Sequence, residues 1–555
     1  MLTLLLDPKS RLRVSGFLRD SNPARVVCAS LLTLSIASCK VGPNFEPPQA
    51  AEYGEPPVFT PPEMTAAEVA TDATAASTGD ANVATNDAAT AAVEPINLDH
   101  WWSRFNDPVL DQLILKADMC NTSVAVALSN VRLAQANLGV TESELWPNIA
   151  AGAGYKRVQQ NFSQIAATGI DLAPYDAYSY GLSLPAWEID LWGRIARSIE
   201  SSTADMRASV DDLRSAMTSI RAQVATSYVG LRTLQARLDV LDASIANLQS
   251  VVDLSAQKYA SGTVTALDFN QAQSNLDLQS AEIPQLRSSM ASAIGQLATL
   301  CGTTSKEMTA LLGEQRAVPM GPDSIPVGVP ASLLERRADL RAASENYAAA
   351  VATIGAAEAQ NYPALTLAGD FSISATSLSG LGDWSNKAYS FGPSLSLPLF
   401  NGWRISSQIN AAKANTELKF NVWRGVLIRA IGEVETSIAT LAFARDSDRR
   451  LTKAVASSTD TYRLAKLQYD SGTTQLENLL DAQNNMLSAE DSLAQSRGLV
   501  AQGIVELYKS LGGGWEQAVP VMSNANKEAK DAIKSSPAAA NAESPIARAE
   551  SGASQ

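Results

Sequence analysis

The longest regular pattern in the chain is a run of apolar residues, three or four positions apart, between Arg194 and Ser261. Steps of three and four over about six heptads predict a coiled-coil helix, and only Gly230 interrupts it. At 1.5 Å per residue, roughly 67 residues make a rod of about 100 Å. The apolar positions are Met206, Val210, Leu213, Met217, Ile220, Val224, Tyr228, Leu231, Leu234, Leu238, Leu241, Ile245, Leu248 and Val252.

Four further segments alternate large apolar residues with small or polar ones, which predicts β-strands. They lie at about 147–162, 177–190, 363–376 and 387–400, and the first has the weakest pattern. Such alternation, with an aromatic residue near the strand end, fits a sheet that faces lipid on one side and water on the other. A soluble hairpin with one buried face would alternate in the same way. If the strands span a membrane, four cannot enclose a lumen, so several subunits must share the barrel.

Two parts of the chain, 194–302 and 404–512, match at a constant offset of 210 residues. Long repeats of this kind usually mean that one supersecondary unit is used twice around a pseudo-symmetric assembly. We therefore expect a first repeat at 98–302 with a long helix at 194–261, a linker at 303–330, and a second repeat at 331–512 with a long helix at 404–471. The matching pairs include Tyr259-x-Ser261-Gly262-Thr263 with Tyr469-x-Ser471-Gly472-Thr473, and Ala272-Gln273 with Ala482-Gln483.

Each repeat also predicts two shorter helices that together match the long helix in length. In the first repeat they run over about 122–146 and from Gly262 to about Gly302, which gives roughly 37 and 60 Å. In the second repeat they run over about 338–361 and 473–511. Pro284 predicts a local kink in the first returning helix, because proline removes a backbone hydrogen bond.

The N-terminus is typical of an exported lipoprotein. Arginines precede an apolar run at 26–38 that is too short to span a bilayer, and small residues lead to Cys39. We expect a signal peptide at 1–38, an acylated Cys39, and an unstructured Ala/Thr/Pro-rich tether at 39–97. A plain signal peptide with an incidental cysteine is the alternative, and the long charged segment before the apolar run leaves a later translation start open. No uncharged apolar stretch of about 18 residues follows Cys39, so no transmembrane helix is predicted.

Composition limits the chemistry that the chain can perform. A net charge of -14 argues against binding to nucleic acid, which needs clustered Lys and Arg. His100 is the only histidine, so we expect no imidazole metal site and no Ser-His-Asp triad. No phosphate-cradling Gly-rich loop precedes a helix, and we expect no cofactor and no enzymatic activity. Cys120 and Cys301 are both predicted near the linker, and in an oxidising compartment they could form a disulfide.

Four motifs together resemble the TolC-like outer-membrane factor family, and specifically its NodT-type lipidated efflux branch of RND systems. The resemblance covers nearly the whole chain outside the tether and a low-complexity tail in 513–555. It implies a mainly helical homotrimer, with long antiparallel coiled-coil helices that form a periplasmic α-barrel tunnel with an equatorial belt, and with four strands per chain in a shared twelve-stranded outer-membrane barrel. The motifs begin at Cys39, Trp101, Trp187 and Val329, and the third reads Trp187-Glu188-Ile189-Asp190-Leu191-Trp192-Gly193-Arg194.

The resemblance also implies roles for residues at the ends of the helical hairpins. The turns at Gly262-Thr263 and Gly472-Thr473 would dock a periplasmic adaptor protein. Tyr469 and Asp481 would face the closed periplasmic gate, and Asn478 stands where some relatives carry a further Asp, so a trimer would hold three carboxylates there rather than six. Asp481 could equally be a charge on a solvated helix face.

These expectations describe the outer-membrane channel of a tripartite efflux system. It would be anchored in the outer membrane by acyl chains, extend into the periplasm, and passively conduct small molecules delivered by an inner-membrane RND-type transporter and the adaptor. Lys40 is in keeping with this location, because Asp after the acylated cysteine commonly signals retention in the inner membrane. The alternatives are a type I protein-secretion duct and a lipid-anchored coiled-coil rod without a pore.

Overall fold

The computed structural model describes residues 40–48, 98, 100–159, 174–312, 316–322 and 336–515. The signal peptide, Cys39, most of the predicted tether and the tail beyond 515 lie outside these residues. The chain divides into two compact units. We call Met1–Glu46, Ala134–Asp205 and Asn346–Lys419 the sheet unit, and Pro47–Leu133, Met206–Glu345 and Phe420–Gln555 the rod unit.

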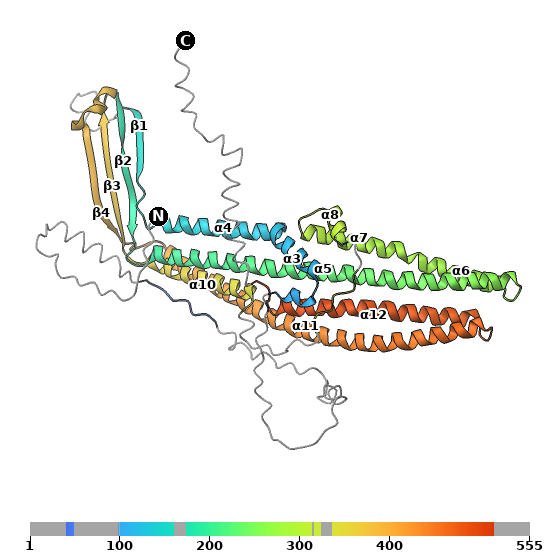
Figure 1. The fold of residues 1–555 in the computed structure, drawn as a ribbon. Helices are drawn as coiled ribbons and strands as arrows, with labels where there is room; N and C mark the ends of the chain where they lie inside the picture. The colour runs from blue at the N-terminus through green and yellow to red at the C-terminus, as the bar shows by residue number, and fades with distance from the viewer. Residues whose placement is uncertain are drawn as a thin grey trace, which may run out of the picture. The chain divides into compact units, whose positions relative to one another are not determined.

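Two helices of equal length carry the repeat (Figure 1). Helix α5 spans Arg194–Ala260 and helix α11 spans Arg404–Asp470, each with 67 residues and with both ends at the offset of 210. Each apolar position that predicted α5 is buried or half-buried, as a coiled-coil seam requires. The prediction of two long antiparallel hairpins is therefore confirmed.

The returning helices differ between the repeats. In the first, α6 (Ala266–Ser280) and α7 (Glu282–Leu300) are separated at Ala281, while in the second α12 (Leu476–Ser510) is continuous. Pro284 lies in the first turn of α7, where its missing N–H would otherwise have bonded to the carbonyl of Ser280. The predicted kink is thus a break between two helices, placed just before the proline.

Shorter helices complete the two units. The 3-10 helix η2 (Trp101–Phe105) leads to α3 (Pro108–Cys120), whose Asp107 cap accepts a hydrogen bond from Val109 N at 2.9 Å. Helix α4 covers Thr122–Ser143, α8 covers Ser305–Leu312 and α10 covers Ala338–Ala359. In the parts of the chain that the structure describes, no helix is both long and apolar enough to cross a membrane.

The sheet contains four antiparallel strands in the order β1-β2-β3-β4 (Figure 1). Their bounds are Ala150–Val158, Tyr175–Ile189, Ala364–Ala375 and Lys387–Ser396. Pro185 lies at a bulge between Leu184 and Trp187, and Pro393 lies on the edge strand β4, the two places where a sheet accepts proline. Short 3-10 helices η4 (Leu378–Gly382) and η5 (Trp384–Asn386) connect β3 to β4.

The core of the rod unit is built around aromatic residues near the start of the first repeat. Trp101 is buried and stacks on Tyr508 with ring centroids 5.6 Å apart.

Cys120 and Cys301 are free thiols, so the structure does not contain the disulfide considered above. Cys301 is buried and donates to the carbonyl of Leu113 at 3.6 Å, and burial raises its pKa to about 11.

The tether prediction is wrong at its beginning. Residues 40–46 form a strap that is bonded to the sheet unit, with Val41 N donating to the carbonyl of Trp192 at 3.1 Å. Glycines and a buried arginine of the sheet unit hold this strap, and composition alone did not signal such contacts. The remainder of the predicted tether, apart from residues 47 and 48, lies outside the described residues.

Candidate functional site

The two hairpin ends have the same turn geometry. Gly262 and Gly472 adopt φ angles of 74° and 76°, a left-handed conformation that glycine accepts readily. In each turn the next threonine N–H closes the helix end, with Thr263 bonding to the carbonyl of Lys258 and Thr473 to that of Gln468, both at 2.9 Å. These four turn residues are exposed. The sequence therefore located both turns correctly, and their role in docking stays a prediction.

Tyr469 joins the two hairpins just behind the turns. Its side chain is 3% exposed, and its hydroxyl lies 3.2 Å from Ser255 Oγ. Lys258 Nζ donates to the Tyr469 carbonyl at 2.7 Å and lies 3.9 Å from the centre of the ring. This combined hydrogen bond and cation–π contact fastens the end of α11 to the end of α5.

Asn478 and Asp481 lie on a different surface from Tyr469. They are three positions apart on α12, so they share one helix face, and both are exposed. Asn478 donates to Thr474 Oγ1 at 3.0 Å, whereas Asp481 has no ion-pair partner among the residues that the structure describes. Of the predicted gate residues, Tyr469 therefore lies in a buried contact between the hairpins, whereas Asn478 and Asp481 lie on an exposed polar face of α12.

A buried polar layer between the hairpins was not predicted. Gln279 accepts a hydrogen bond from Ser244 Oγ at 2.9 Å and donates to Asn484 Oδ1 at 3.1 Å, while Gln483 donates to the Ser244 carbonyl at 3.0 Å. Buried polar groups are costly to leave unbonded, so these hydrogen bonds fix which residues of the two hairpins face each other, while Gln483 Oε1 has no partner among the described residues. The sequence feature that could have indicated this layer is the Ala-Gln pair repeated at 272–273 and 482–483. The second of these pairs contributes Gln483 to the layer.

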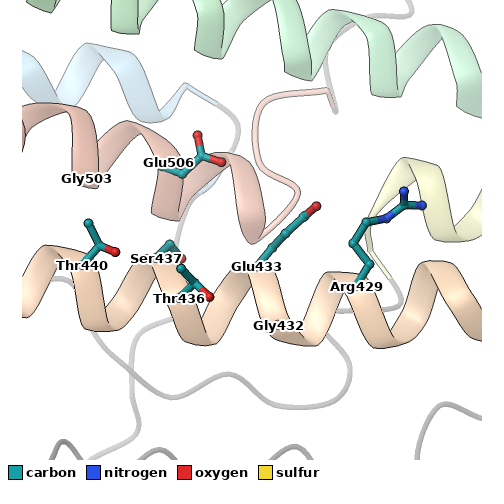
Figure 2. A pocket seen from close by; sticks show the side chains of 8 residues that line it. All are labelled: Arg429, Gly432, Glu433, Thr436, Ser437, Thr440, Gly503 and Glu506. Carbon is teal, nitrogen blue, oxygen red and sulfur yellow. The ribbon is translucent and has the colours of Figure 1, made fainter.

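A groove of about 400 Å³ lies on the rod unit between α11 and α12 (Figure 2). Its lining includes Gly432 and Gly503, whose missing side chains help to create the space. Glu433 is paired with Arg337 at 2.7 Å and therefore is not a free acid or base.

The third sequence motif, Trp187–Arg194, forms the junction between the end of β2 and the start of α5. Arg194 donates to both carboxylate oxygens of Glu188 at 2.9 and 3.0 Å, and Trp192 donates to the Pro363 carbonyl at 2.9 Å. Trp192 also stacks on Tyr362 with centroids 4.7 Å apart. These contacts tie the end of β2 to the segment that leads from α10 into β3.

The surface of the sheet carries large apolar side chains. Tyr389, Phe391 and Leu395 on β4 are 75%, 74% and 69% exposed, and they occupy alternate positions of the strand. Side chains at alternate positions share one face of a sheet. An exposed apolar face of this kind is unusual in water and is expected where strands contact lipid.

Comparisons with known proteins agree with this arrangement. A family model described as "Outer membrane efflux protein" matches residues 113–303 and 329–513, close to the two repeats. Nodulation protein T of Rhizobium leguminosarum bv. trifolii is 27% identical over 491 residues, which cover 87% of this chain and 96% of that protein. Outer membrane protein OprJ of Pseudomonas aeruginosa is 28% identical over 502 residues, or 89% of this chain and 97% of OprJ.

The fold matches a solved structure described as the outer-membrane channel OprN. The TM-score is 0.70 at 31% sequence identity, and the match covers 76% of this chain and 93% of OprN. The family, the fold and the apolar face of the sheet all point to the outer membrane. The chain belongs to the outer membrane efflux protein family and is an outer-membrane channel protein with the fold of the TolC-like factors.

Proposed function

We propose that this protein is the trimeric, lipid-anchored exit channel of a tripartite efflux system. It conducts small molecules passively, and an inner-membrane RND-type transporter drives them through a periplasmic adaptor. The family assignment supports the efflux function. The location is supported by the similarity to OprJ, an outer membrane protein, and to OprN, an outer-membrane channel. Acylation of Cys39 rests on the sequence motif.

The sheet supports the trimer. Its edge strands β1 and β4 each pair with one neighbour among the described strands, and unpaired backbone groups are not tolerated in hydrocarbon. Three copies placed edge to edge would close a barrel of about twelve strands. Exposed Val126, Leu133 and Val140 recur at seven-residue spacing on α4, which is the seam of a coiled coil with a helix from another subunit.

Electrical recording tests the channel directly. Purified mature protein added to a planar lipid bilayer should give long-lived single-channel currents, and its mass in detergent should be that of three chains. A heat-denatured sample provides the control. A monomer that passes no current would instead support a lipid-anchored rod, and loss of exported protein rather than of drug resistance in a deletion strain would support a type I secretion duct.

The hairpin ends would form the gate in this proposal. The exposed carboxylate of Asp481 contributes three negative charges near the narrow end of a trimer, which attract multivalent cations. Hexaamminecobalt(III) should therefore block wild-type current, and Asp481→Asn should weaken the block by at least about threefold. Asn478→Asp adds a second carboxylate on the same helix face and should strengthen the block. Equal block in all three proteins would contradict this placement of the gate.

A further inference from the structure

The N-terminal strap, residues 40–46, contacts the place where β2 ends and α5 begins. Val41 N bonds to the carbonyl of Trp192 at 3.1 Å, and Lys40 Nζ lies 3.3 Å from Glu200. Phe45 meets the ring of Tyr347 edge-on, with centroids 5.5 Å apart. The contacts of the strap therefore include the parts of α5 and α10 that belong to the sheet unit.

Arg197 supplies most of the hydrogen bonds to the strap. Its side chain is 1% exposed, yet Nε donates to the Val41 carbonyl at 3.1 Å, and Nη2 donates to the Gly42 carbonyl at 3.0 Å and to Asn44 Oδ1 at 2.9 Å. Nη1 donates to Glu200 at 3.1 Å. A buried guanidinium must be surrounded by acceptors, and here three of the four acceptors belong to the strap.

Glycines let the strap approach the helices closely. A side chain on Gly42 would lie 2.4 Å from the Cα of Gly355, and one on Gly355 would lie 2.6 Å from the Val41 carbonyl oxygen. A side chain on Gly193 would lie 3.0 Å from the Cα of Lys40. The first two separations are too short for a side chain and the third is tighter than most real contacts, so all three glycines fit a bound strap.

The second repeat lacks these features at its equivalent positions. At the offset of 210, Trp403 stands in place of Gly193 and Ser407 in place of Arg197. Trp403 is 75% exposed and meets the ring of Phe400 edge-on, with centroids 6.2 Å apart. Gly193 and Arg197 of the first repeat are therefore not matched in the second, so the strap's contacts are not a by-product of the duplication.

We propose that Arg197, Gly193 and Gly355 form a binding site, the clasp, for the chain's own N-terminal segment. The clasp would hold the lipid anchor near the end of the strands that adjoins the helices. Lys40, the first described residue of the strap, lies beside the strand–helix junction and directly follows Cys39 in the sequence. The anchor part rests on the proposed function. The low-complexity segment follows the clasp in sequence and does not separate it from Cys39.

Limited proteolysis of the full-length purified protein tests the clasp. Trypsin cuts after lysine, and both the N–H and the carbonyl of Val41 are hydrogen-bonded in the clasped state, so loss of the clasp should free the Lys40–Val41 bond for cleavage. Arg197→Ala should speed cleavage at this bond by at least about tenfold, because charge-assisted hydrogen bonds are lost. Mass spectrometry of the new N-terminus at Val41 identifies the cut. Arg237→Ala, which removes an ion pair with Asp491 on the same helix, is the matched control and should cut at the wild-type rate.

Two further variants guard against a folding defect in Arg197→Ala. Gly355→Val wedges the strap away without changing a charge, and Asn44→Ala removes one acceptor within the strap itself. Cleavage should quicken in the order Asn44→Ala, Gly355→Val, Arg197→Ala. Equal rates in these variants, wild type and Arg237→Ala would overturn the clasp.

The mass of the mature wild-type N-terminus separates the clasp from the anchor. An acylated Cys39 together with a protected Lys40–Val41 bond supports both parts of the proposal. A protected bond on a chain without acyl groups would leave the clasp standing but overturn the anchor and the lipidation in the proposed function. An acylated chain with an unprotected bond would overturn the clasp alone.

Discussion

The two repeats share the length of their long helices and the geometry of their turns, but they differ in their side-chain contacts. Their long helices both contain 67 residues, and their turns at Gly262 and Gly472 have nearly the same φ angle. Inside the long helices, however, buried Tyr228 of the first repeat corresponds to Ile438 of the second. The comparison teaches that helix length and turn geometry are shared by both halves of the tunnel wall, while packing and polar contacts distinguish them.

The largest expected effect concerns the contact between α12 and α5. A side chain on Gly498 would lie 2.3 Å from Thr233 Oγ1, whereas its counterpart in the first repeat, Ser288, is exposed. Gly498→Ala should therefore lower the free energy of unfolding by about 2 kcal/mol, because the helices must move apart. Thermal unfolding in detergent, followed by circular dichroism, measures the change.

Gly295 is the matched control for this variant. It lies in α7, and a side chain there meets nothing within 4 Å. Gly295→Ala should stabilise the protein by about 0.5 kcal/mol, since alanine restricts the unfolded chain more than glycine does. If both variants shifted stability in the same direction, the close α12–α5 contact would not distinguish the repeats.

The buried tyrosines of the two long helices give the next effect. Tyr228 donates to the carboxylate of Asp107 and accepts from Arg232 Nε at 3.0 Å, whereas the Tyr462 hydroxyl is buried without a partner among the described residues. Tyr228→Phe should cost about 1–2 kcal/mol of unfolding free energy because the carboxylate and the guanidinium each lose a partner. Tyr462→Phe should be neutral or slightly stabilising. The same detergent melts compare the pair, and equal losses would contradict the assignment.

Tyr228 also predicts a pH dependence. Burial, followed by the hydrogen bond to Asp107, raises its pKa from 10.0 to about 12. The phenol ionises more readily in the unfolded chain, so its contribution to stability is complete below about pH 10 and is lost as pH rises towards 12. Alkaline melts of Tyr228→Phe should lack this part of the decline, and an identical alkaline profile would argue against a buried, bonded phenol.

The sequence was sufficient for the elements whose signal is periodic and local. The heptad seam of α5 and the glycine turns were predicted within one or two residues, because apolar spacing and left-handed φ angles depend on nearby residues. Alternation located the strands, with ends that differ by a few residues. The fold class, mainly helical with four strands per chain, was predicted from these elements together with the four sequence motifs.

Contacts between distant segments were beyond the sequence. The strap was predicted as part of a tether, because its binding depends on Arg197 and Gly355, which are more than 150 positions away along the chain. Ser244, Gln279 and Gln483 form the buried polar layer only after two hairpins have packed. Tyr469 was singled out by motif, but its contact with Lys258 required the structure.

The smallest effect concerns the first turn of each returning helix. Helix α6 begins with a capping box, in which Thr265 accepts from Asp268 N and the Asp268 carboxylate accepts from Thr265 N at 2.9 Å. Helix α12 has Gln475 and Asn478 at the same positions and no side-chain hydrogen bond at its cap. Thr265→Ala should therefore cost about 1 kcal/mol, since the Asp268 N–H loses its acceptor.

The reverse exchange sharpens this last comparison. Gln475→Thr combined with Asn478→Asp would build the same box on α12 and should stabilise that hairpin end by about 0.5 kcal/mol. Hydrogen exchange of the amides at 476–478 reports the change locally, where a global melt would be insensitive. Asn478→Asp alone is the control, because it adds the charge without the hydroxyl acceptor. Equal protection in the single and double variants would show that charge at the helix N-terminus, and not the reciprocal box, makes the two ends differ.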